Sequence, residues 1–349
     1  MLPNFHSKCH VKFMSNSNYS NSDLMARIKR KLCFKIKIPI LLVLLLFILL
    51  CVHYMKPVKC SLDKDNEKNK PKYELLIVIL TAPDNMERRN IIRRTWMSEK
   101  YSYVKYFFAI GTVNIQQALH ETLQSENHKH KDLLLLPTLR DSYNTITKKV
   151  LYSFKQLTED YDFDFLLKCD DDSYVVIESL LKELSKWQSR GTQKELYWGY
   201  FNGRAQVKRH GPWKETNWIL CDYYLPYALG GGYVLSSNLV KFISRNWEVL
   251  KIYSAEDVSV GVWLAPLANI ERKHDTRFDT EYQSRGCSND YIITHKQSIQ
   301  KMQYMHELSA ITRKLCSKEL IIHKSYQYNW TVPPSQCCNR EQDVSPKGS

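Results

Sequence analysis

The amino-acid sequence predicts an α/β domain in which helices cover both faces of a sheet. Short apolar runs typical of buried strands alternate with segments whose apolar residues follow helical spacing. Such alternation is typical of sheets whose strands are connected by helices. The chain has 349 residues, 44% of them hydrophobic, with 22 Tyr, 12 Phe and 8 Trp. It is therefore long enough to bury a large core, and its composition argues against disorder.

The elements expected from these patterns begin after residue 73. Strands are expected at 75–80 (LLIVIL), 103–111 (YVKYFFAIG), 132–136 (DLLLL) and 163–168 (FDFLLK). Helices are expected at 86–96, within 142–157 and near 176–187, where apolar residues recur with helical spacing. Residues from about 195 to 340 are more aromatic and less regular, and we expect them to form the second half of the same domain.

The amino-terminal segment holds most of the net charge of +14. Residues 1–59 contain ten Lys or Arg and one acid, Asp23, so they account for +9 and leave +5 for the other 290 residues. The remainder is only mildly basic, and we expect no binding to nucleic acid or other polyanions in general.

An apolar run of 18 residues, 38–55, follows directly after five basic residues. As a helix it would extend about 27 Å, enough to cross a thin bilayer, and the basic flank would stay in the cytosol. The sequence predicts a cytoplasmic tail (1–37), a transmembrane signal anchor (38–55), a polar stem (56–72) and a catalytic domain (73–342) in the lumen. A cleaved signal peptide is the alternative, but its apolar region and leader are usually shorter.

The cysteines fit an oxidising compartment. Five of the ten lie in the carboxyl-terminal half at irregular spacing, without a C-x-x-C pair. Disulfides are therefore favoured over a zinc site, although their pairing does not follow from the sequence. In the same compartment Asn329, in the sequon Asn-Trp-Thr, would be accessible to glycosylation.

Two acidic motifs and one glycine run are candidates for the site. Asp170, Asp171 and Asp172 follow a buried strand, where their oxygens suit Mg²⁺ or Mn²⁺, although they would equally cap a helix. Glu256 and Asp257 precede an apolar helix, where they would serve as a general base or as helix caps. Residues 230–232 are glycines that permit either close approach to a ligand or a plain bend. No P-loop or dinucleotide fingerprint accompanies them.

Basic and aromatic residues add weaker signals. Arg88, Arg89, Arg93 and Arg94 lie on one short predicted helix, where they would bind phosphate or form a solvated basic face. His295 is either a metal ligand or proton carrier, or a structural histidine. Eight aromatic residues between 197 and 224, Trp213 among them, would stack on sugar rings or, for most of them, pack in the core.

Taken in chain order, the motifs resemble the beta-1,3-galactosyltransferase family, glycosyltransferase family 31. They are R-x-x-I-R-x-T-W (89–96), D-x-Y (141–143), K-C-D-D-D-S (168–173), L-G-G-G-Y-V-L-S (229–236) and E-D-V (256–258). Stretches such as LYWGYFNGR, HDTRFDTEYQSRGCSN and PPSQCC are similar to one member, which acts on the proteoglycan linkage region. The likeness covers roughly residues 73–340.

The resemblance implies a GT-A fold, UDP-galactose as donor, Mn²⁺ as cofactor and a glycan acceptor, which the aromatic composition of residues 195–340 already suggested for that half of the domain. The acceptor implied is galactose-β1,4-xylose on a core protein. The location implied is the Golgi membrane, as a single-pass type II protein with a lumenal catalytic domain. The reaction implied is one in-line displacement that inverts the anomeric carbon.

The resemblance also implies roles for particular residues. Asp257 would be the base, supported by Glu256, while Asp172 and His295 would bind the metal. Asp170 and Asp171 would lie at the metal–nucleotide site. UDP would be held by Arg89, Arg93 and Asp141. The sugar pocket would be lined by Gly231 and Gly232. Cys169 replaces a small residue usual before the acids, and we expect its thiol to face the core.

Three other functions compete with this interpretation. A relative that uses UDP-N-acetylglucosamine would share the same motifs. A non-catalytic sugar-binding protein would be free to lose Asp172, Asp257 or His295, and all three are present. A heparin-binding surface protein is disfavoured by the mild charge after residue 59.

Overall fold

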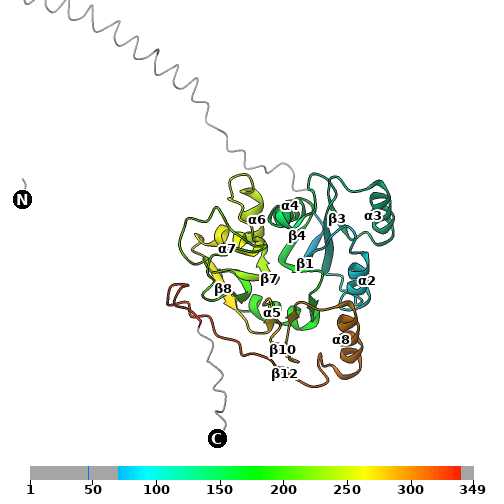
Figure 1. Cartoon of the computed structure of the whole chain (residues 1–349). Coiled ribbons are helices and arrows are strands. Elements are labelled where there is room, and N and C mark those ends of the chain that lie inside the picture. Colours follow the sequence, from blue (N-terminus) through cyan, green and yellow to red (C-terminus); the bar gives the residue numbers. More distant parts are fainter. Residues whose placement is uncertain (1–45, 47–69, 339–349) are drawn as a thin grey trace, which may run out of the picture. The chain divides into compact units, whose positions relative to one another are not determined.

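The computed structural model describes Leu46 and residues 70–338. By its internal contacts the chain divides into residues 1–68 and 69–349, and the second unit contains the folded domain (Figure 1). The expected tail and nearly all of the expected anchor and stem lie outside the described residues. Within the described part of the chain, no helix combines the length and the apolar character needed to span a bilayer.

The centre of the domain is a mixed sheet of seven strands. In spatial order they are β3 (Leu133–Leu136), β2 (Val104–Gly111), β1 (Lys72–Leu80), β4 (Asp162–Asp170), β7 (Ala228–Ser236), β6 (Glu195–Phe201) and β8 (Ile270–His274). All neighbours are parallel except β7, which is antiparallel to both β4 and β6. Leu75 to Ile79 of β1 have no exposed surface, because this strand lies inside the sheet with both faces covered.

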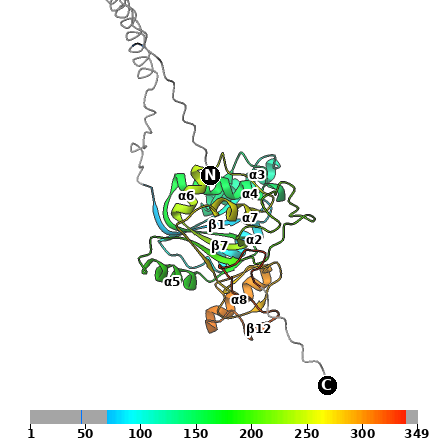
Figure 2. The ribbon, with the colours of Figure 1, turned by 90° about the vertical axis from the view of Figure 1, so that its left-hand side faces the viewer.

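Helices cover both faces of this sheet. In chain order they are α2 (Met86–Arg94), α3 (Gln117–His130), the 3₁₀ turn η1 (Tyr143–Thr145), α4 (Ile146–Asp160), α5 (Ile177–Gln188), α6 (Ser237–Arg245), α7 (Glu256–Leu264) and α8 (Ile299–Thr312). Helices α4, α6 and α7 gather on one side, and α5 and α8 lie on the other (Figures 1 and 2). The predicted α/β architecture is confirmed.

Two small sheets extend the second half of the domain. One contains β5 (Tyr174–Val175), β11 (Ile293–Thr294) and β9 (Phe278–Asp279), and the other pairs β10 (Gly286–Cys287) with β12 (Leu320–Ile321). Because β11 pairs with β5, which follows the acidic turn after β4, a carboxyl-terminal segment lies beside that turn.

The expected strands and helices of the first half are confirmed, with ends shifted by a few residues. The expectation of an irregular second half is only partly right. Strands β6, β7 and β8 come from that region and supply three of the seven strands of the central sheet. Helix α3 was also not anticipated, because its sequence, QALHETLQSENHKH, contains only two leucines and is otherwise largely polar.

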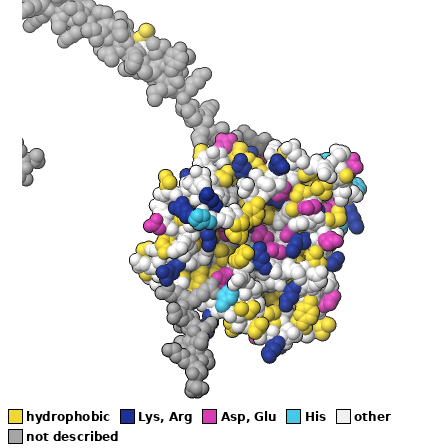
Figure 3. Space-filling view, in the orientation of Figure 1, with side chains coloured by type: hydrophobic (Ala, Val, Ile, Leu, Met, Phe, Trp, Pro, Cys, Tyr) yellow, Lys and Arg dark blue, Asp and Glu magenta, His cyan; other side chains and the backbone are white. Residues whose placement is uncertain are grey.

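The cysteines of this domain form two disulfides, Cys287–Cys316 and Cys337–Cys338, as expected in kind. Cys169 is buried in β4, where burial raises the pKa of its thiol, and Cys221 is exposed and forms no disulfide within residues 70–338. Acidic and basic side chains are interspersed on the face shown in Figure 3, which agrees with the mild charge expected of the domain.

Candidate active site

Three potential metal ligands meet beyond the carboxyl end of β4. Asp170 ends that strand, Asp172 lies in the following turn, and His295 comes directly after β11. Ligand atoms from the three residues lie within 4.8 Å of one another. Nε2 of His295 is 2.8 Å from Oδ1 of Asp172 and 3.5 Å from Oδ2 of Asp170. Folding thus brings two carboxylates and a distant imidazole into one group.

Backbone contacts hold the imidazole against the acidic turn. The N–H of His295 donates to the carbonyl of Asp279 at 2.9 Å, and the N–H of Gln297 donates to the carbonyl of Asp172 at 2.8 Å. Gly231 leaves the space that the ring occupies, since a Cβ at this position would lie 2.6 Å from Cγ of His295. A side chain at residue 231 would therefore displace the histidine.

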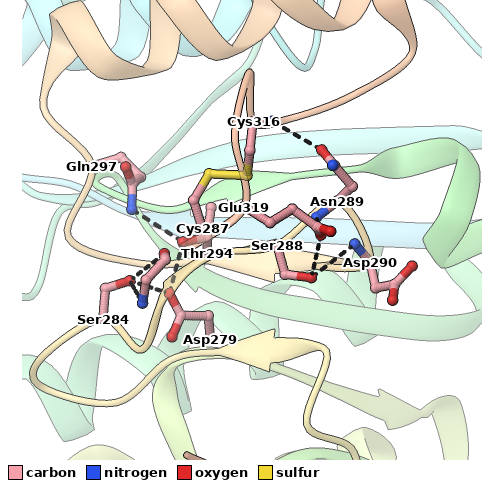
Figure 4. The surroundings of a disulfide bond; sticks show 11 residues. Asp279, Ser284, Cys287, Ser288, Asn289, Asp290, Thr294, Gln297, Cys316 and Glu319 are labelled. Carbon is pink, nitrogen blue, oxygen red and sulfur yellow. Dashed lines mark hydrogen bonds between the residues drawn. A yellow bond between two sulfur atoms is a disulfide. The ribbon is translucent and has the colours of Figure 1, made fainter. Parts of the chain in front are cut away.

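A disulfide ties down the segment that leads to His295 (Figure 4). Cys287 and Cys316 are 29 residues apart in sequence, and the side-chain oxygen of Asn289 accepts a bond from the N–H of Cys316 at 3.0 Å. Further along, the side-chain amide of Gln297 donates to the hydroxyl of Thr294 at 3.1 Å. Closing a loop of this length stabilises a fold by about 3–4 kcal/mol in the chain-entropy view. The histidine thus sits on an anchored segment.

The donor set fits a divalent cation. Carboxylate oxygens and imidazole nitrogens are suitable ligands for such ions. Oδ1 of Asp172 and Nε2 of His295 are buried and, despite their proximity, are not aligned for a hydrogen bond with any described residue. Burial alone would lower the pKa of His295, but Asp170 and Asp172 raise it to about 9. The two carboxylates that raise this pKa would equally attract a bound cation, which would take the place of the proton on the imidazole.

A buried lysine connects this group to the second acidic motif. The Lys168 side chain, only 1% exposed, donates to Oδ1 of Asp170 at 2.9 Å, to the carbonyl of Gly230 at 2.7 Å and to Oε1 of Glu256. Burial would lower its pKa, but the two carboxylates outweigh that effect and raise it. The lysine thus stays charged and joins β4, β7 and α7.

Asp257 and Glu256 form the first turn of α7 and have different surroundings. Asp257 is half-buried, and its two oxygens accept the N–H groups of Val258 at 2.8 Å and Gly230 at 3.0 Å. Glu256 is buried and accepts the hydroxyl of Tyr233 at 2.9 Å as well as Lys168. Burial raises the pKa of both acids, that of Glu256 to about 7. Asp257 keeps lone pairs and an open side for a reacting hydroxyl, whereas Glu256 is enclosed.

The arginines expected to hold UDP are occupied within the fold. Arg89 has no exposed surface, and it donates to both carboxylate oxygens of Glu126 at 2.8 Å and to two backbone carbonyls. Arg93 donates to both oxygens of Asp132 at 2.7 and 2.8 Å and pairs with Glu126. These bonds lock α2 to α3 and β3. Direct contact with phosphate would require breaking these bonds.

Asp141 and Asp171 flank the end of β1 rather than the group around His295. Asp141 accepts the N–H of Gly111 at 3.0 Å and the Lys149 ammonium at 2.5 Å, and Lys149 also donates to the carbonyl of Thr81. Asp171 accepts the hydroxyl of Thr81 at 2.7 Å and the amide of Asn85 at 2.9 Å. The side chain of Asp171 thus fixes the turn after β1 and is not one of the three clustered ligands.

Gly232 and Asn329 both lie in the described part of the chain, and neither is one of the three clustered ligands. Gly232 is buried, and a Cβ there would lie 2.9 Å from Ile293, so this glycine, like Gly231, makes room for a neighbouring side chain. Asn329 is exposed, and its side-chain oxygen accepts the hydroxyl of Thr331 at 2.7 Å. The sequon is therefore accessible to a modifying enzyme.

The sequence patterns gave no role to Lys168, Lys149, Glu126 or Asp132. The signal for Lys168 was its place in FDFLLKCD, where one charged residue interrupts an apolar strand. A charge at such a position must be paired, and acids follow two residues later. Glu126 and Asp132 gave no local signal, because their partners lie more than thirty residues away.

Comparison with known proteins identifies the family. A galactosyltransferase family model matches residues 87–276. Mouse beta-1,3-galactosyltransferase 6 is 45% identical over 274 residues, which cover 77% of this chain and 84% of that protein. Hydroxyproline O-galactosyltransferase GALT6 of Arabidopsis thaliana is 29% identical over 249 residues, which cover 69% of this chain and 36% of the plant protein.

A third relative is UDP-GalNAc:beta-1,3-N-acetylgalactosaminyltransferase 2 of Danio rerio, 35% identical over 145 residues, or 42% of this chain and 29% of that protein. The α/β architecture with its mixed central sheet is consistent with a glycosyltransferase domain. The chain belongs to the galactosyltransferase family, as an enzyme of its beta-1,3-galactosyltransferase group.

Proposed function

We propose that this enzyme transfers galactose from UDP-galactose to the 3-hydroxyl of a β-galactoside, inverting the anomeric carbon. The acceptor proposed is galactose-β1,4-xylose of the glycosaminoglycan–protein linkage region, in keeping with the 45% identity to beta-1,3-galactosyltransferase 6. One observation carries the proposal. The clustered Asp170, Asp172 and His295 are joined through Lys168 to the strand and helix that hold Asp257.

In this mechanism Asp257 accepts the proton of the acceptor hydroxyl as that oxygen attacks C1 of galactose. The N–H groups of Gly230 and Val258 each bond to one oxygen of the carboxylate and so fix its orientation. The raised pKa of Asp257 makes it a stronger base than an exposed aspartate. Glu256 does not touch the acceptor in this scheme. It orients Lys168 and Tyr233 instead.

The donor would lie between the acidic turn and the end of β1. Asp172 and His295, with Asp170 beside them, would hold Mn²⁺, which when bound would neutralise the diphosphate leaving group. Asp141 and Asp171 would shape the nucleotide side of the site through Lys149 and Thr81. Arg89 and Arg93 would hold α2 in place beneath it.

The family membership supports further proposals about setting. A GT-A fold accounts for the mixed sheet with the acidic turn at the end of a central strand. A type II arrangement in the Golgi membrane would place the disulfides and the accessible Asn329 sequon in an oxidising lumen.

The test is a transfer assay on the purified full-length chain with UDP-galactose, Mn²⁺ and a β-galactosyl-xyloside. We expect release of UDP and formation of a trisaccharide whose new linkage is β1,3 by NMR. UDP-N-acetylglucosamine and UDP-N-acetylgalactosamine serve as alternative donors in parallel. Faster transfer from either one would overturn the galactose assignment, and absence of transfer from every donor would favour a non-catalytic sugar-binding protein.

A further inference from the structure

Three large aromatic side chains form an exposed row next to the proposed site. Tyr143, Trp213 and Tyr282 are 49%, 37% and 71% exposed. The ring centroid of Trp213 lies 5.9 Å from that of Tyr143 and 5.9 Å from that of Tyr282, with edge-on packing in both pairs. Aromatic rings usually bury their area in the core, so three that contact one another in solvent point to a binding surface.

The three rings come from different segments, and each segment is fixed close to a residue of the site. Tyr143 opens η1, two residues after Asp141, whose carboxylate is bonded to Gly111 and Lys149. Tyr282 follows Asp279 by three residues, and the carbonyl of Asp279 accepts the N–H of His295.

The loop of Trp213 is anchored just before α7. The buried carboxylate of Glu215 accepts the N–H of Ser254 at 2.8 Å, and the hydroxyl of Ser254 donates to the carbonyl of Lys214 at 2.9 Å. Ser254 is three residues before Asp257. The row is therefore positioned by the same elements that hold the proposed base and metal ligands.

Electrostatics agrees with this placement. The pKa of Tyr143 is raised to about 12, chiefly by burial of part of the side chain and also by the charges of Asp170 and Asp257. Both acids must lie within electrostatic range of the Tyr143 hydroxyl. Tyr143 is therefore the ring whose surroundings connect the row with the two acidic motifs.

We propose that Tyr143, Trp213 and Tyr282 form a carbohydrate subsite that binds the acceptor sugar next to the one that reacts. The apolar C–H face of a pyranose packs on an aromatic ring, and three exposed rings in contact, with successive centroids 5.9 Å apart, offer such a face beside the reacting sugar. Exposed rings with two side-chain torsions pay little entropy on binding. The inference rests on the proposed galactosyl transfer, and it adds the surface along which the acceptor continues beyond the reacting sugar.

The test compares two acceptors with the full-length enzyme, a methyl β-galactoside and a β-galactosyl-xyloside. We expect Tyr282→Ala and Trp213→Ala each to raise KM for the disaccharide roughly tenfold, which corresponds to about 1.4 kcal/mol. The kcat, the KM for UDP-galactose and the KM for the monosaccharide should change less than twofold. Tyr282→Phe should restore the disaccharide KM, because it keeps the ring.

Tyr304→Ala is the matched control, since this tyrosine on α8 is 46% exposed and lies outside the row. An unchanged disaccharide KM in both row variants would overturn the subsite, as would an equal loss for both acceptors. Wild-type enzyme that transfers to neither acceptor would instead overturn the proposed function, so the two failures are distinguishable.

Discussion

Replacing Lys168 with methionine tests the connection between the two acidic motifs. Methionine keeps the length of the side chain and removes the charge and all three donors. The lysine is 1% exposed and touches Asp170, Glu256 and the carbonyl of Gly230. Its loss would leave Glu256, 5% exposed, as a buried acid with only Tyr233 as partner.

The size of the effect follows from that burial. Breaking a buried ion pair by removing one partner costs about 3–5 kcal/mol. A domain of this size loses roughly 2–4 °C in Tm for each kcal/mol. We therefore expect Lys168→Met to lower Tm by about 10 °C. Neutralising the orphaned acid should restore part of the loss, so Lys168→Met combined with Glu256→Gln should be more stable than the sum of the single effects by at least about 1.5 kcal/mol.

Thermal unfolding followed by circular dichroism measures all three variants. Lys186→Met is the control, because Lys186 is 60% exposed in its side chain and pairs only with Glu183 on the surface, so its Tm should change by less than about 2 °C. A similarly small change for Lys168→Met, or strict additivity in the double variant, would refute the reasoning that the lysine neutralises a buried acid.

Four further predictions concern single groups. Asp257→Asn should lower kcat at least about a hundredfold while UDP affinity by calorimetry is kept, and near-normal turnover would remove it as the base. Asp172→Ala should abolish Mn²⁺-dependent UDP binding; an unchanged titration would exclude it as a ligand. Burial lowers the pKa of His274 to about 4. As the pH falls, the unfolded chain therefore binds a proton at this histidine before the folded chain does. The free energy of unfolding, which has its full value above about pH 6.5, should fall by up to about 3 kcal/mol toward pH 4. His274→Gln should flatten that decline in Tm, and a decline of wild-type steepness would contradict the assignment. Iodoacetamide should label Cys221 but not the buried Cys169 in the folded enzyme, as mapped by mass spectrometry.

The sequence was sufficient to place the acidic turn. FDFLLK is an apolar run that is too short for a typical helix and fits a buried strand. Acids directly after such a strand lie at the carboxyl edge of the sheet. Residues whose role depends on one strand end, such as Asp170 and Asp172, could be anticipated in this way. His295 could not be placed by spacing, because the pairing of β11 with β5 brings it there from more than a hundred residues away.

The arginines of α2 show what a local pattern leaves open. Four arginines on α2 indicate positive charge, but the sequence does not show which charge they meet. Arg89 and Arg93 form ion pairs with Glu126 and Asp132, and the side chains of both arginines are 9% exposed or less. A buried charge needs a partner, and the spacing of the arginines along the sequence does not show that Glu126 and Asp132 provide it.

The antiparallel strand β7 explains why the two acidic motifs can share one edge of this sheet. Strand β4 ends at Asp170, and Cys169 is paired with Gly232, so β7 begins where β4 ends. Had β7 been parallel, Gly230 would lie at the opposite edge. Because it is not, the carbonyl of Gly230 meets Lys168 and its N–H meets Asp257. One peptide segment without side chains thus spans the gap between the two motifs, and a side chain at residue 230 would collide with Glu256, 2.7 Å from the position of its Cβ.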